Sequence, residues 1–126
     1  MNILFLDDDP ARIEQFTSMF PTAVVATMAG DCMHLLRTRK WDYVFLDHDL
    51  DGQVFVDPSE TNTGSEVVRY LCSPLMLSRK DYVGTVVVHS MNHMQVGNMC
   101  SNLVDAGYVA RLAAFGSDRF HLLARG

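Results

Sequence analysis

The chain has 126 residues, of which 48% are hydrophobic, and its formal net charge is -5, with 10 Lys and Arg against 15 Asp and Glu. This length predicts a single domain over residues 1–126, with enough apolar residues for an ordinary core. The negative charge argues against dedicated DNA binding or membrane-surface binding. It does not exclude a site that holds a phosphate through a metal ion.

Targeting and redox signals predict a cytoplasmic protein. The chain begins directly in an apolar segment without a basic leader, and no apolar run approaches the ~20 residues of a membrane helix. The three cysteines lie far apart without CxxC spacing, which is typical of reduced thiols. The sequence leaves the oligomeric state open.

Strand-like and helix-like segments alternate in the first half of the chain. The first apolar run is continuous, as expected of a strand covered on both faces. Pro10 suits the first turn of a helix, and Pro21 ends that helix. The predicted elements are a strand at 2–6, a helix at 10–20, a strand at 23–27, a helix at 30–39 and a strand at 42–46.

The same alternation continues after a polar loop at residues 48–62. Thr63 or Ser65 is a candidate cap for the third helix, whose predicted apolar side carries Val67, Val68, Leu71 and Leu75. The next predicted elements are a strand at 83–88 and a helix that begins after a cap at Asn92 and ends at Gly107. The residues of this helix expected to face the core are Val96, Met99, Cys100, Leu103 and Val104. A strand at 108–115 and a short helix or edge segment at 116–126 complete the chain.

This order predicts an α/β fold with a five-stranded parallel sheet and helices on both faces. Three polar clusters then fall at the carboxyl ends of strands, the edge where parallel sheets place ligand sites. The clusters are Asp7 to Asp9, Asp47 to Asp51, and His89 to Asn92. Residues about 80 positions apart are therefore expected in one crevice.

Motifs in these clusters resemble a response-regulator receiver domain. ILFLDDDP is similar to its first strand, with Asp7 and Asp8 as the acidic pair, and DYVFLD places Asp47 at the phosphate-accepting aspartate. TGSEVVRYL is similar to the helix that follows. VVVHS places Ser90, or less readily His89, where receivers have a phosphate-contacting Thr or Ser.

The resemblance spans about residues 1–112 and implies a receiver or flavodoxin-like fold, with several departures. Arg111 is in the last strand, which lacks the receiver's lysine, and the loop after Asp47 is long. Two histidines, His48 and His89, flank the expected pocket, and the last helix is truncated. DDD with DHDL and HSMN resembles the cyclic-phosphate-processing receiver-like domains of bacteria, phages and mobile elements. That resemblance implies hydrolysis of a cyclic phosphate.

Crowded carboxylates are tolerable when a divalent cation neutralises them. The predicted metal ligands are Asp7, Asp8, Asp47, Asp49 and His48. Oxygen ligands alone suit Mg²⁺, whereas added imidazole favours Mn²⁺, Fe²⁺ or Zn²⁺, so the identity of the metal stays open. Such an ion could activate a water for attack on phosphorus.

The predicted catalytic residues are His89, Asp47, Ser90 and Asn92. His89 titrates near neutral pH and is a candidate proton carrier. Ser90 and Asn92, at a helix N-terminus, could donate hydrogen bonds to phosphate oxygens. Arg111 is a candidate charge clamp.

Several of these residues have a structural alternative. Asp9 could cap the first helix, and Asp51 could belong to a turn. His48 faces away from the crevice if its neighbour Asp47 points in. His89 could pack under a neighbouring helix.

Three functions follow from these patterns. The first is a metal-dependent hydrolase of a small phosphorylated molecule, with a cyclic nucleotide or other cyclic phosphate as a candidate substrate. The second is a phospho-accepting signalling receiver, and the third is a non-catalytic pseudo-receiver that binds a ligand or a protein.

Overall fold

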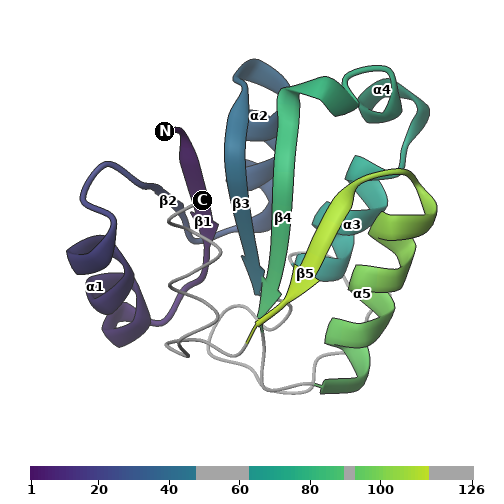
Figure 1. Cartoon of the computed structure of the whole chain (residues 1–126). Helices are drawn as coiled ribbons and strands as arrows, with labels where there is room; N and C mark the ends of the chain where they lie inside the picture. Colours follow the sequence, from purple (N-terminus) through teal and green to yellow (C-terminus); the bar gives the residue numbers. More distant parts are fainter. Residues whose placement is uncertain (48–62, 90–92, 114–126) are drawn as a thin grey trace.

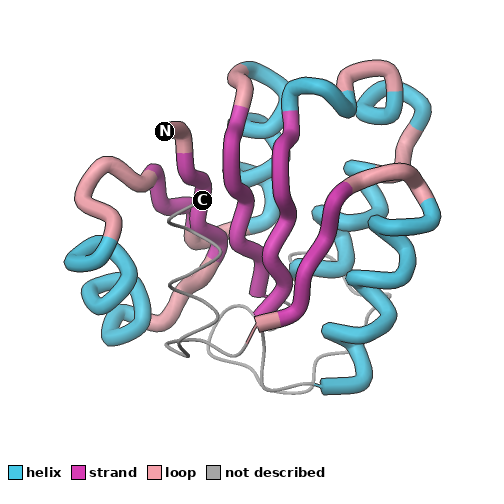
Figure 2. Tube along the Cα trace, in the orientation of Figure 1, coloured by secondary structure: helices cyan, strands magenta, loops and turns pink. Residues whose placement is uncertain are grey.

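The computed structural model describes residues 1–47, 63–89 and 93–113. In these residues, five strands form one sheet in the order β2-β1-β3-β4-β5, and all neighbours are parallel. The strands are β1 (Ile3–Leu6), β2 (Val24–Ala26), β3 (Trp41–Asp47), β4 (Val83–His89) and β5 (Val109–Leu112). The predicted parallel α/β sheet is confirmed, and Figure 2 shows its strands side by side.

Helices cover both faces of this sheet, as predicted. They are α1 (Pro10–Met19), α2 (Ala29–Thr38), α3 (Gly64–Leu71), α4 (Pro74–Leu77) and α5 (His93–Asp105), with a 3-10 turn at Lys80–Tyr82. Helix α1 lies on one side of the sheet, whereas α2, α3 and α5 lie on the other (Figure 1).

Alternation along the strands divides the core between the two faces. The larger cluster packs α2, α3 and α5 against one set of strand residues, among them Leu4, Leu6, Val44, Leu46, Val86 and Val88. The smaller cluster lies under α1 and contains Phe5, Phe16 and Phe45. The Phe5 and Phe16 rings stack with centroids 4.0 Å apart and planes inclined by 6°. This aromatic contact fixes the face that α1 turns toward the sheet.

Three predicted helix ends are confirmed. Asp9 caps α1 by accepting a hydrogen bond from the Ala11 amide at 2.9 Å, and Thr63 caps α3 by accepting one from the Glu66 amide at 3.1 Å. Gly107 follows α5 with φ of 100°, a conformation that glycine adopts without strain.

Other details of the prediction were wrong. Leu75 lies on the separate helix α4 and is exposed, and Val104 is an exposed residue of α5. Strand β4 extends to include His89, whereas β5 ends at Leu112. The predicted loop at 48–62 and the predicted truncated helix at 116–126 lie outside the described residues.

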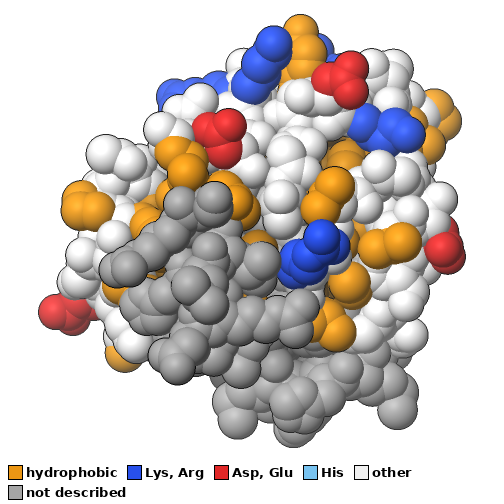
Figure 3. Space-filling model, viewed as in Figure 1, with side chains coloured by type: hydrophobic (Ala, Val, Ile, Leu, Met, Phe, Trp, Pro, Cys, Tyr) orange, Lys and Arg blue, Asp and Glu red, His pale blue; other side chains and the backbone are white. Residues whose placement is uncertain are grey.

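The surface of the described chain mixes both signs of charge. On the face in Figure 3, basic and acidic side chains lie in separate small groups among apolar ones. No helix in the described ranges has the length and apolar character needed to cross a membrane.

Candidate functional site

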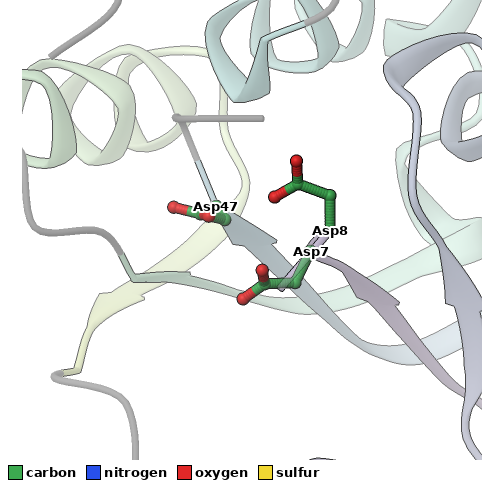
Figure 4. A group of neighbouring side chains, drawn as sticks. All are labelled: Asp7, Asp8 and Asp47. Atoms are coloured by element: carbon green, nitrogen blue, oxygen red, sulfur yellow. The ribbon is translucent and has the colours of Figure 1, made fainter. Parts of the chain in front are cut away.

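Three carboxylates meet at the carboxyl edge of the sheet. Asp7 and Asp8 follow the last residue of β1, and Asp47 is the last residue of β3, the strand beside it. Each offers an oxygen, and these oxygens all lie within 4.8 Å of one another. Figure 4 shows the three side chains gathered at the strand ends. The structure therefore brings together Asp7, Asp8 and Asp47 as the sequence indicated.

Two of these carboxylates are buried. Asp7 is 0% exposed and Asp47 is 3% exposed, whereas Asp8 is partly exposed. A buried ionised carboxylate costs several kcal/mol unless charge and hydrogen bonds compensate it. The site therefore requires positive charge close to Asp7 and Asp47.

Arg12, in the first turn of α1, supplies such a charge. Its Nε donates to Asp7 Oδ2 at 2.7 Å and its Nη2 donates to Asp7 Oδ1 at 2.8 Å, which makes a bidentate pair. The same Nη2 donates to Asp47 Oδ2 at 3.2 Å, and Nη1 lies 3.3 Å from Asp9 Oδ2. These carboxylates raise the pKa of Arg12, so its guanidinium stays charged.

The packing of α1 explains why Arg12 faces the site. Phe16 is four residues further along the helix, so Arg12 and Phe16 share a face. Stacking of Phe16 on Phe5 presses this face against the sheet. Asp7 is two residues after Phe5, and successive alternate residues of a strand point to the same side. Asp7 and Arg12 thus meet above the aromatic contact.

Sequence reasoning missed Arg12. A charged residue in the first turn of a helix is usually solvated, so its identity alone carries no signal. Its spacing does: Arg12 lies three residues after Asp9 and four before Phe16, so on a helix it is close to both side chains. An arginine on the same helix face as a phenylalanine, next to an acidic run, was the available clue.

His89 lies beside Asp47. The two are register partners on β4 and β3, so their side chains project from the same face. His89 is 2% exposed and its ring stacks on Phe5, with centroids 5.4 Å apart. Burial lowers its pKa to about 4; the charge of Asp7 partly offsets this and Arg12 adds to it. The imidazole is therefore neutral at pH 7.

Arg111 does not lie at the site. It pairs in register with Val87, two residues before His89, and its side chain is exposed and donates to the Ala110 carbonyl at 3.0 Å. Continuing the register by one residue beyond Leu112 places Ala113 next to His89, and Ala113 belongs to the core under α1. The predicted charge clamp from β5 was therefore wrong, and α1 provides the cation instead.

The remaining predicted site residues lie outside the described residues. They are His48, Asp49 and Asp51 from the loop after β3, and Ser90 and Asn92 from the segment before α5. Their roles stay predictions.

The sheet order and the acidic edge define a receiver domain of the response-regulator type. The chain matches the model of the family described as cyclic-phosphate processing receiver domain over residues 2–105, which is most of its length. It therefore belongs to this family, and the resemblance noted in the sequence is confirmed. No curated protein is similar enough to this chain to match it.

Solved receiver structures share this fold at low identity. A CheY-like receiver domain from Methylobacillus flagellatus superposes with a TM-score of 0.68 at 19% identity, covering 99% of this chain and 94% of that chain. The response regulator TrrA from Thermotoga maritima, solved with Mg²⁺ and BeF, gives 0.67 at 16%, covering 98% and 96%. A receiver domain of a sensor histidine kinase from Pseudomonas aeruginosa, with magnesium in its active site cleft, gives 0.62 at 15%, covering 98% and 92%.

Proposed function

We propose that the acidic edge, formed by Asp7, Asp8 and Asp47, is the active site of a metal-dependent hydrolase that acts on a small phosphorylated molecule. The proposed substrate class is a cyclic nucleotide or another cyclic phosphate. The observation that carries this proposal is the approach of three carboxylates, two of them buried, within 4.8 Å. The description of the family as cyclic-phosphate processing supports the choice of substrate.

A divalent ion fits these residues. The three carboxylates carry three negative charges against one from Arg12, so the cluster keeps an excess of negative charge. Their oxygens are hard ligands of the kind that Mg²⁺ and Mn²⁺ prefer. The solved T. maritima and P. aeruginosa receivers contain magnesium, which supports the same class of ion here.

Asp8 and Asp47 are the principal candidate ligands. Asp7 already accepts hydrogen bonds at Oδ1 from the Asp9 amide and Arg12, and at Oδ2 from Arg12. A carboxylate has about four acceptor positions, so Asp7 retains room for one water or one metal contact. Asp49 and His48 stay proposed additional ligands from the loop.

When bound, the ion would polarise the phosphoryl group and favour ionisation of an attacking water. His89, the register partner of Asp47, is the proposed carrier of the proton released by that water. Ser90 and Asn92 are proposed donors to phosphate oxygens. The cytoplasm stays the proposed location, because all three cysteines are free thiols, which persist in a reducing compartment.

A second candidate is a phospho-accepting receiver, favoured by the place of Asp47 at the end of β3 and by contact between Arg12 and Asp47. Incubation with acetyl phosphate separates the two. We expect slow or undetectable labelling of Asp47 for two reasons. Asp47 is buried, and the residue that follows β5 in register with Asp47 and His89 is Ala113, which carries no positive charge. Stable, stoichiometric labelling of Asp47 would favour the signalling function.

The direct test is turnover of a panel of cyclic and linear nucleotides and simple cyclic phosphates, each with Mg²⁺, Mn²⁺ or EDTA. Metal-dependent release of a ring-opened product, lost in Asp47→Asn, is the expected result. An absence of turnover together with an absence of labelling would leave the pseudo-receiver, a binding module without chemistry.

A further inference from the structure

We propose that Arg12 is the anion-binding residue of this site, held by Asp7 so that its Nη2 group recognises a phosphoryl group beside Asp47. This inference rests on the proposed function only in requiring that a phosphate bind at the acidic edge. It applies to a phosphate that is hydrolysed and equally to one that is transferred to Asp47.

The first support is the way Arg12 is anchored. Both oxygens of Asp7 accept hydrogen bonds from its guanidinium, at 2.7 and 2.8 Å, and Asp7 is 0% exposed. A bidentate pair with a buried carboxylate fixes the plane of the guanidinium. The Asp9 carboxylate, 3.3 Å from Nη1, holds the opposite edge of the fork.

The second support is the weaker contact with Asp47. Nη2 reaches Asp47 Oδ2 at 3.2 Å, longer than either bond to Asp7, and this contact joins α1 to a different strand. It can be exchanged without disturbing the Asp7 pair. A phosphoryl oxygen next to Asp47 would present a similar negative charge to the same Nη2 donor, and hydrogen bonds from a guanidinium to a phosphate oxygen are charge-assisted.

The third support is access. The Arg12 side chain remains 29% exposed, whereas those of Asp7 and Asp47 are 0% and 4% exposed. Arg12 therefore contacts both buried carboxylates and is also open to a phosphate that arrives from solvent. In the described part of β5, Arg111 is turned to the Ala110 carbonyl and does not compete for this role.

The test measures two affinities by calorimetry: that for Mg²⁺ alone, and that for inorganic phosphate at saturating Mg²⁺. Arg12→Gln should weaken phosphate binding by about 10-fold or more, the scale of hydrogen bonds to a charged group. Its Mg²⁺ affinity should be equal or tighter, because the positive charge near the ligands is removed. Arg12→Lys keeps the charge without the fork, so its loss should be no larger than that of Arg12→Gln.

The matched control is Arg37→Gln, an exposed arginine of α2 that contacts His34; both affinities should stay at wild-type values. Unchanged phosphate affinity in folded Arg12→Gln would overturn the inference. Weakened Mg²⁺ binding would also overturn it, because Arg12 would then only hold the acids in place. If wild type binds neither Mg²⁺ nor phosphate, the proposed function fails instead.

A measurement on wild type covers the case in which the variants do not fold. The Arg12 Nε–H resonance is followed by NMR while phosphate is added to the Mg²⁺-saturated protein. We expect a saturable shift at Arg12 and none at Arg37. Bound phosphate without a shift at Arg12 would contradict the inference.

Discussion

Asp47 and His89 are register partners on adjacent parallel strands, and they are 3% and 2% exposed. A carboxylate and a neutral imidazole are thereby fixed side by side at the edge where β1, β3 and β4 end. The stack of His89 on Phe5 holds the ring on the side that carries α1. This pairing places His89, the proposed proton carrier, next to Asp47.

The role of His89 is tested by His89→Gln. If the imidazole accepts a proton during hydrolysis, turnover of the best substrate should fall by about 10²-fold, the usual scale for a general base. Turnover is normalised to the folded fraction from circular dichroism, because loss of the Phe5 stack also lowers stability. Normalised turnover equal to wild type would reduce His89 to a packing residue.

Stability should fall in acid because of the same residue. The pKa of His89 is about 4 in the folded chain, against an ordinary 6.5. Between pH 6.5 and pH 4, His89 is therefore protonated in the unfolded chain and neutral in the folded chain. The free energy of unfolding should therefore drop as pH falls from 6.5 to 4, by up to about 1.4 kcal/mol per pH unit. Above pH 6.5 this contribution is constant.

Urea unfolding in EDTA between pH 4.5 and 7.5 measures that slope. His89→Gln should lack the His89 component, while His34→Gln, at an exposed position of α2, should keep the wild-type slope. Parallel curves for wild type and His89→Gln would mean that His89 is not the buried neutral group described here.

The metal site is tested by thermal unfolding with Asp47→Asn. Millimolar Mg²⁺ or Mn²⁺ should raise the melting temperature of wild type, because the ion binds the folded chain. Asp47→Asn should lose this rise and, without metal, be as stable as wild type or more so, because a buried charge is removed. Asp31→Asn, an exposed acid in the first turn of α2, is the control and should respond normally. A full response in Asp47→Asn would exclude Asp47 as a ligand.

The Asp7 and Arg12 pair predicts unequal costs in a double-mutant cycle. Arg12→Gln leaves a fully buried carboxylate without its two guanidinium bonds and should cost about 3 kcal/mol. Asp7→Asn leaves a cation that is partly exposed and can be rehydrated, so it should cost about 1–2 kcal/mol. The double variant should lose less than the sum of both. Strict additivity of the unfolding free energies in EDTA would show that the pair is not coupled.

Local patterns were enough for the fold and for the three carboxylates of the acidic edge, but not for the cation beside them. Continuous apolar runs identified the strands, because a parallel strand is buried on both faces. Asp7, Asp8 and Asp47 could be assigned to one crevice because parallel strands end at a common edge. The Asp9 cap followed from its position before Pro10.

Local patterns misplaced residues whose burial depends on neighbouring elements. Leu75 and Val104 fit the helical spacing of apolar residues but face solvent. A break at Pro74 starts a new helix before Leu75. Val104 follows directly after the buried Leu103, near the end of α5, where the sheet covers only one side of the helix.

Only the tertiary structure decided which cation serves the site. The sequence predicted that Asp7, Asp8 and Asp47 would meet at the sheet edge, and it pointed to Arg111 as the cation, whereas the role of Arg12 was missed. Arg111 was excluded by the register of β5, which sets it two residues short of the edge. Arg12 reaches the site because Phe16, on the same face of α1, stacks on Phe5 of the sheet. This contact sets the orientation of α1 about its axis and places Arg12 beside Asp7. Helix rotation and strand register arise from contacts between distant segments, so the position of the guanidinium is a property of the packed chain.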